Sequence, residues 1–129
     1  PISMTEFSEK IAILPNGQVK YLTDKYDAIT NTLGLKVTIR VSDFKAIEAA
    51  ILKNKSYTEL DKLAELARKN YPKSMLADYE LGLMYEKNGD TKKAAKAYQK
   101  ASQFDEIGDL SKDMMLEKFD EMQSLTPKK

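Results

Sequence analysis

With 129 residues, 32% of them charged and 42% hydrophobic, the chain has the composition of a soluble globular domain rather than of a disordered one. Its 21 basic and 20 acidic side chains leave a formal charge of +1, without the basic excess of a typical nucleic-acid-binding domain. The chain has no Cys and no His, which excludes disulfides, thiolate chemistry, the usual zinc ligands and the commonest general base.

Other features of the sequence also argue against catalysis and membrane insertion. No apolar run approaches the ~20 residues that a membrane-spanning helix needs. No G-x-S-x-G motif is present, and a pair of catalytic carboxylates would need a cleft that sequence alone does not reveal. We therefore expect no catalytic, cofactor-binding or metal-binding residue, and predict that this chain alone is not an enzyme. It starts at Pro1 without a basic-then-apolar leader, so we expect no signal peptide. The missing initiator Met fits either a piece cut from a longer polypeptide or ordinary removal of the Met.

The N-terminal third is predicted to hold two helices and a connector. Apolar residues at helical spacing from Phe7 to Leu14 predict a first helix that stops at residues 15–17. The spacing from Val19 to Leu33 predicts a second helix, with Gly34 at its left-handed end. Residues 35–41 alternate between apolar and polar, but a single strand has no partner. We read them as an extended connector with Val37, Ile39 and Val41 pointing inward.

Five more helices are predicted beyond residue 41, so that the count is seven helices and no sheet. Ser42 is the expected cap of the first, and residues 56–59 (Ser-Tyr-Thr-Glu) form a capping box for the next, which Pro72 ends. Ser74 and Asp90 are the expected caps of the following two, which are separated by a stop at residues 88–89. The last helix carries an apolar stripe from Met115 to Met122 and ends near residues 126–127.

A repeat of 34 residues relates the middle helices. A shift of 34 places Ile47 on Leu81 and Leu63 on Ala97, and it brings the turns at residues 53–54 and 87–88 into register. A helix-turn-helix period of 34 residues is typical of tetratricopeptide repeats. Residues 75–108 resemble that family through Leu81-Gly82, Tyr85, Gly89, Ala94, Tyr98 and Ala101. Small Gly82 and Ala94 are expected where the two helices approach, with the tyrosines filling the gaps beside them.

Residues 41–74 are a poorer copy of the repeat. They keep Phe44, Tyr57, Ala67 and Pro72, but Glu48 stands where the family has Gly. In the second copy Asp78 replaces the usual aromatic residue. The alternative is an ordinary helical bundle whose period is a coincidence.

The resemblance implies an all-α fold in which antiparallel helix pairs stack as a short array within one compact domain. Its segments are 1–40 (helices and connector), 41–74 and 75–108 (two repeats), and 109–129 (a C-terminal capping helix, with one polar face toward water). For the function it implies a non-catalytic module that binds a protein or peptide. Carried over from the family, the partner groove comprises Lys45, Ala49, Leu52, Leu76, Tyr79, Leu83 and Glu86. The open alternative is that the N-terminal helices or the connector cover Tyr79 and Leu83.

A second resemblance concerns residues 55–90. The runs at residues 55–57, 70–74, 79–82 and 88–90 are similar to the C-terminal tail of certain bacterial esterases, in which an α/β-hydrolase domain precedes a short tetratricopeptide tail. This implies a non-catalytic accessory domain of a larger hydrolase, whose partner is the adjoining domain. No catalytic residue carries over, because the catalytic domain is absent from this sequence.

Three sharper interpretations are less favoured. The basic stripe of Lys92, Lys93, Lys96 and Lys100 lacks interleaved aromatic residues for stacking bases and is typical of a solvated face, so we predict no nucleic-acid partner. The acidic residues between 105 and 113 lack the Gly and Glu positions of a calcium loop. A chaperone-tail clamp would need Asn where Ala49 and Glu80 stand.

Overall fold

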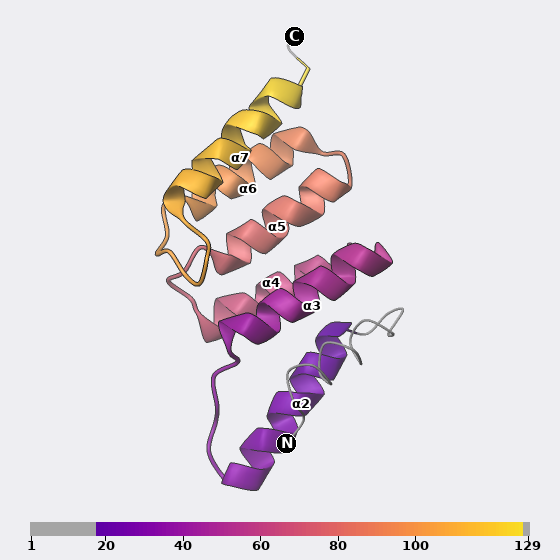
Figure 1. Ribbon diagram of the computed structural model, residues 1–129, viewed down its shortest axis with the longest axis vertical. Helices are drawn as coiled ribbons and strands as arrows, with labels where there is room; N and C mark the ends of the chain where they lie inside the picture. Colours follow the sequence, from indigo (N-terminus) through magenta and orange to yellow (C-terminus); the bar gives the residue numbers. More distant parts are fainter. Residues whose placement is uncertain (1–17, 128–129) are drawn as a thin grey trace. The chain divides into compact units, whose positions relative to one another are not determined.

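The computed structural model describes residues 18–127, and the predicted all-α architecture is confirmed there (Figure 1). Beyond two isolated β-bridges, the described residues contain no strand. None of the described helices combines the length and the apolar character that crossing a bilayer requires. The helix predicted between Phe7 and Leu14 lies outside the described residues. The described helices are α2 (Gln18–Leu33), α3 (Val41–Asn54), α4 (Glu59–Asn70), α5 (Leu76–Lys87), α6 (Thr91–Ala101) and α7 (Lys112–Leu125).

The chain divides into two compact units, residues 1–59 and 60–129, whereas the sequence predicts one compact domain. The segments 1–40, 41–74, 75–108 and 109–129 follow the register of the repeat instead, and they stay predictions. The two divisions differ because the units are defined by contacts in space, whereas the segments are defined by the spacing of the repeat along the chain.

The first unit contains α2, the connector and α3. Gly34 ends α2 with a left-handed φ of +71°, as predicted, and its N–H donates to the carbonyl of Thr30 at 2.9 Å. The connector forms no strand. Ile39 is buried, but Val37 and Val41 are only half-buried, so the inward alternation holds in part.

A buried polar cluster fastens α2 to α3. The Tyr26 hydroxyl donates to the carboxylate of Asp43 at 2.5 Å and accepts the backbone N–H of Arg40 at 3.1 Å. The Lys25 ammonium lies 3.4 Å from the same carboxylate oxygen. Burial, more than the hydrogen bond to Asp43, raises the pKa of Tyr26. The phenol therefore stays protonated as a donor and joins the two helices.

Two of the predicted helix starts are corrected. Helix α3 begins at Val41, so Ser42 lies inside it, and Arg40 precedes it without a side-chain capping bond. Helix α4 begins at Glu59, and the capping box is not formed. Instead the Glu59 carboxylate accepts the backbone N–H of Gln18 at 2.9 Å, at the start of α2. The hydrogen bond to Gln18 thus replaces the local capping box, because a carboxylate can accept an unpaired N–H at the start of any helix.

The second unit stacks α5, α6 and α7 as successive neighbours, with α6 packed against both of the others (Figure 1). The predicted stop at residues 88–89 is confirmed, and Gly89 adopts a left-handed φ of +81°. Asp90 caps α6 as predicted, since its carboxylate accepts the N–H of Lys93 at 3.1 Å. The short connection between α5 and α6 makes these two helices antiparallel.

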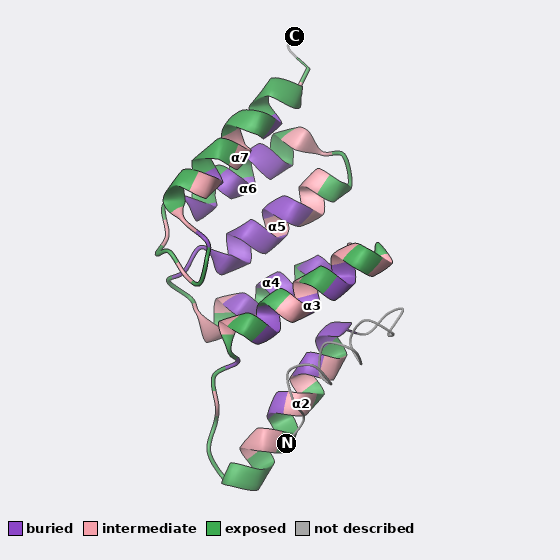
Figure 2. Cartoon of the chain, viewed as in Figure 1, coloured by how far each residue is buried: buried purple, intermediate pink, exposed green. Residues whose placement is uncertain are grey.

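Gly82 sets how closely α5 and α6 approach. A Cβ at this position would lie 2.5 Å from Cε1 of Tyr98, closer than two carbon atoms can pack. Tyr98 is fully buried, and Ala94 is fully buried on the same helix. Figure 2 shows buried residues along both helices. The predicted pairing of a small residue with a large one is therefore present at this contact.

An ion pair explains why Asp78 stands at a position where an aromatic residue is expected. The guanidinium of Arg68 on α4 donates to both carboxylate oxygens of Asp78 on α5, at 3.2 and 3.1 Å. The Asp78 side chain is 3% exposed and that of Arg68 is 39% exposed. The hydrogen bonds to Asp78 raise the pKa of Arg68 above its ordinary value. A two-pronged ion pair thus ties α4 to α5 at this point.

Candidate functional site

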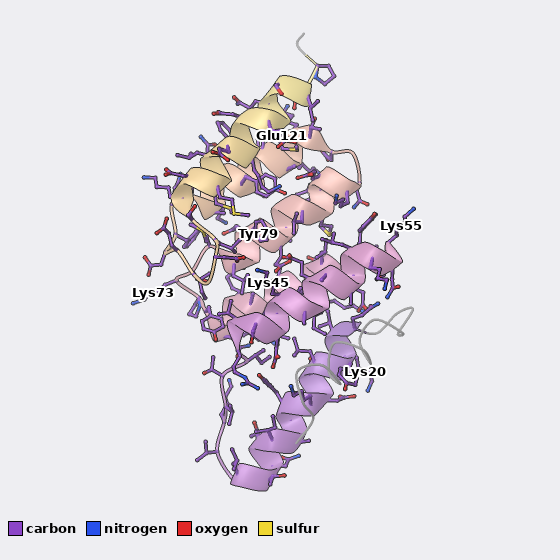
Figure 3. The ribbon with its side chains drawn as sticks, in the orientation of Figure 1. Lys20, Lys45, Lys55, Lys73, Tyr79 and Glu121 are labelled. Atoms are coloured by element: carbon purple, nitrogen blue, oxygen red, sulfur yellow. The ribbon has the colours of Figure 1, made fainter. Side chains whose placement is uncertain are left out.

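Three of the seven predicted groove residues lie on one face of α3. Lys45, Ala49 and Leu52 are spaced four and three residues apart, which places them on the same side of a helix. Lys45 and Ala49 are exposed, and Leu52 is half-buried (Lys45 is labelled in Figure 3). This face of the first unit is therefore partly exposed to solvent.

The four predicted groove residues on α5 offer much less surface. Leu76, Tyr79 and Leu83 are buried, with Tyr79 and Leu83 only 8% and 5% exposed (Tyr79 is labelled in Figure 3). The ring centre of Tyr79 lies 6.3 Å from that of Tyr98. Because α3 and α5 belong to different units, a groove that joins all seven residues stays a prediction.

Glu86, the last of the four, is half-buried and already engaged. Its carboxylate accepts the hydroxyl of Tyr98 at 2.7 Å and lies 3.7 Å from the Lys118 ammonium. The Lys118 ammonium also lies 5.4 Å from the centre of the Tyr98 ring. Glu86 therefore serves the packing of α5, α6 and α7 against one another.

The face of α5 that carries Tyr79 and Leu83 faces the interior. The resemblance places both residues in a partner groove, with burial as the open alternative, and the structure buries both, whereas Leu81 and Tyr85 of the repeat pattern are half-buried. Apolar residues occur around most of the circumference of helix α5, so its periodicity does not select one face. Contacts with neighbouring side chains, such as the contact of Tyr79 with the Tyr98 ring, determine which face is buried.

An open groove of about 1290 Å³ lies between α6 and α7, entirely within the second unit. From α6 it is lined by Thr91, Lys92, Ala95, Lys96 and Gln99, which share one face of the helix. From α7 it is lined by Phe119, Gln123 and Ser124, and the turn at residues 88–90 and residues 126–127 complete the lining. We call this surface the α6–α7 groove.

A hydrogen bond joins the two walls of the α6–α7 groove. The hydroxyl of Thr126 donates to the carbonyl of Met122 at 2.8 Å. A hydroxyl has one proton, so in its 2.9 Å contact with Thr91 it is Thr91 that donates. The start of α6 is thereby tied to the end of α7. The groove is built on helices whose spacing is fixed by packing along their length.

The charge of the α6–α7 groove is positive. Its one carboxylate, Asp90, accepts the N–H of Lys93 and lies 3.9 Å from the Lys93 ammonium, so the capping interaction occupies it. Lys92 and Lys96 are exposed and form no ion pair with any described carboxylate. The floor is apolar, with Ala95 buried and Phe119 half-buried. The groove thus combines two cations, amide and hydroxyl groups, and an aromatic ring.

The lysine stripe of the sequence separates into two sides in the structure. Lys92 and Lys96 line the groove, whereas the Lys93 ammonium lies 5.8 Å from the centre of the Tyr85 ring. The helical spacing of the lysines was visible in the sequence. What sequence reasoning missed is that Phe119 borders the same hollow, because this depends on how α7 packs on α6.

A smaller hollow of about 430 Å³ lies along α4 and reaches Leu81 of α5. Its charged residues include Asp61, Glu65 and Lys69 from successive turns, and Arg68, which is engaged with Asp78. The described part of the chain holds no cluster of three acidic side chains arranged to bind a metal ion. The mixed charges of this hollow do not favour one kind of ligand.

Comparison with protein-family models and with curated proteins finds no match. Among solved structures, the chain resembles an uncharacterised protein from Capnocytophaga ochracea DSM 7271, with a TM-score of 0.88 and 34% identity. The match covers 96% of this chain and 35% of that chain. The likeness supports the all-helical fold. It also means that this chain spans about a third of the length of the protein it resembles.

Proposed function

We propose that this chain is a non-catalytic protein-interaction module of tetratricopeptide type, whose partner is a protein or a peptide. The observation that carries the proposal is the α6–α7 groove, an open surface built on packed helices and furnished with cations, amides and an aromatic ring. Helix-lined grooves of this kind are suited to holding a peptide or a helix of another protein. The exposed face of Lys45 and Ala49 on α3 offers a second surface.

The non-catalytic part of the proposal rests on chemistry. The chain has neither His nor Cys, so that a nucleophile would lack the usual activating base. Of the four buried acids among the described residues, Asp43 and Asp78 are bound to Tyr26 and Arg68, which makes these two structural links between helices. We therefore expect no hydrolysis of short-chain esters by this chain.

Site-specific cross-linking in the cells that encode the protein tests the proposal. A photoreactive benzophenone side chain is placed at Ala49 on the α3 face or at Gln99 in the α6–α7 groove. Lys62, exposed on α4 and outside both surfaces, carries the control substitution. We expect a discrete adduct with another polypeptide from at least one of the two surfaces and none from position 62. Equal or absent cross-linking at all three positions contradicts the proposal.

The second candidate is a non-catalytic accessory domain of a larger bacterial esterase or other hydrolase. The observation that favours it is the solved structure, in which the matching region makes up 35% of a longer chain. Expression of the complete natural gene tests it. We expect ester hydrolysis from the complete product and none from residues 1–129 alone. A complete product that ends at these residues, or that hydrolyses no ester, contradicts this candidate and leaves the interaction module standing.

A further inference from the structure

We propose that the α6–α7 groove binds an acidic peptide segment of a partner protein, with carboxylates that meet Lys92 and Lys96 and an apolar side chain that contacts Phe119. This inference rests on the proposed function and names the binding surface and the chemical character of the partner. Its first support is charge complementarity. The two ammonium groups are exposed and unpaired among the described residues, and the one carboxylate of the lining is already engaged with Lys93.

The positions of the two lysines set the spacing of the acidic groups. Lys92 and Lys96 are four residues apart on α6, which separates them by one turn, about 6 Å along the helix axis. Carboxylates four residues apart on a helical peptide have the same separation. Gln99 continues the face by one further turn and offers an amide that can donate to a third acceptor.

The composition of the groove and the low overall charge favour a peptide over a nucleic acid. Phe119 is half-buried and lines the groove together with Ala95. An apolar side chain placed against Phe119 would gain from burial. Phe119 is the one aromatic residue of the lining, whereas a groove for single-stranded nucleic acid stacks successive bases on several aromatic side chains. The formal charge of the chain, +1, gives little long-range attraction for a polyanion.

The test lets the protein select its own ligand. A phage-displayed library of random peptides, each about 16 residues or four helical turns long, is panned on the purified chain. Selected peptides are synthesised with a fluorescent label, and their dissociation constants are measured by anisotropy. We expect enrichment of peptides with acidic residues four apart beside an apolar residue. We also expect affinity to fall as NaCl rises from about 0.05 M to about 0.3 M, because screening weakens exposed charge pairs.

Matched variants locate the binding surface. The double variant Lys92→Glu/Lys96→Glu reverses both groove charges, and Lys62→Glu/Lys100→Glu makes the same change of charge at exposed positions outside the groove. We expect the first pair to weaken binding by about tenfold or more and the second by less than about twofold.

A second groove variant, Gln99→Glu/Gln123→Glu, keeps both lysines and adds two negative charges at exposed positions of the lining. It is expected to weaken binding as well. Thermal unfolding of every variant by circular dichroism shows that the fold is kept. If one groove variant fails to fold, the other still tests the proposal.

The outcomes separate this inference from the function beneath it. If the groove and control variants lose the same affinity, the peptide does not bind specifically in the groove, because its attraction would then depend on overall charge alone. Selected peptides that lack acidic residues, or that bind the groove variants normally, also overturn it and leave an interaction module that binds elsewhere. Tighter, Lys92- and Lys96-dependent binding of single-stranded RNA or anionic vesicles assigns the groove to another ligand. A library from which no peptide is enriched counts against both proposals.

Discussion

Replacing Gly82 by Ala should destabilise the protein, although the same change stabilises most helices. Ala is favoured over Gly in a helix interior by about 1 kcal/mol. At this position, however, the added Cβ would lie 2.5 Å from Cε1, 2.7 Å from Cδ1 and 2.9 Å from Cζ of Tyr98. All three contacts are shorter than van der Waals distance, so that the ring or the helix has to move.

The Tyr98 ring is poorly able to move. It is fully buried, its hydroxyl donates to the Glu86 carboxylate at 2.7 Å, and the Lys118 ammonium lies over its face. Overpacking a core costs about 1–3 kcal/mol, and weakening a hydrogen bond to a charged group costs about 1.5–3 kcal/mol if it is lost completely. After subtraction of the helix preference, we expect Gly82→Ala to lower the free energy of unfolding by about 1–3 kcal/mol.

A double-mutant cycle measured by urea denaturation tests this reasoning. In a Tyr98→Leu background the obstructing ring is gone, so Gly82→Ala should stabilise the protein by up to about 1 kcal/mol. The coupling free energy between the two positions, the difference between these two effects, should then be about 1–4 kcal/mol. If Gly82→Ala stabilises the unaltered chain, or has the same effect in both backgrounds, the close contact does not control the approach of α5 and α6.

Two further predictions concern buried polar links. Arg68→Ala should lower the free energy of unfolding by about 2–3 kcal/mol, because it leaves the Asp78 carboxylate buried without its partner. Arg68→Lys, which keeps the positive charge, should lower it less. If urea denaturation of Arg68→Ala shows a loss below about 0.5 kcal/mol, the ion pair contributes little to stability. Tyr26→Phe should lower the free energy of unfolding by about 1–3 kcal/mol at neutral pH, because the hydrogen bond to Asp43 and the one accepted from the Arg40 N–H are lost. Because the folded-state pKa of Tyr26 is raised above the ordinary 10.0, its contribution is complete below that pH and is lost as the pH rises through the raised pKa. Between about pH 9 and 11, the unfolding temperature should therefore fall more steeply with pH for the unaltered chain than for Tyr26→Phe. Parallel curves for the two proteins would show that the Tyr26 hydroxyl is not the group responsible.

The sequence by itself determined which segments are helical and where most of them end. Gly34, Pro72 and Gly89 stop helices because of their own backbone preferences, and Asp90 caps α6 through a bond to a residue three positions away. The small residue under a large one, Gly82 against Tyr98, was also readable from the repeat spacing. In each case the cause lies within a few residues or within one recurring pattern.

Only the tertiary structure decided which partner is bound by a polar side chain that has more than one available. Glu59 reads as part of a local capping box, but its carboxylate accepts the N–H of Gln18, 41 residues away. Asp78 reads as a departure from the repeat, but Arg68 explains it. Such pairings join residues far apart in the chain or on different helices, and local spacing carries no information about them.

The same reason explains the candidate site. Apolar residues occur around most of helix α5, so its pattern does not select the buried face, and the burial of Tyr79 depends on contacts such as that with the Tyr98 ring. Lys92 and Lys96 could be placed on one helical face from the sequence alone. Their opposition to Phe119 across a hollow requires α7 to pack on α6 in one particular orientation. The period of a helix fixes which residues share a face, and the packing of neighbouring helices fixes whether that face is core or groove.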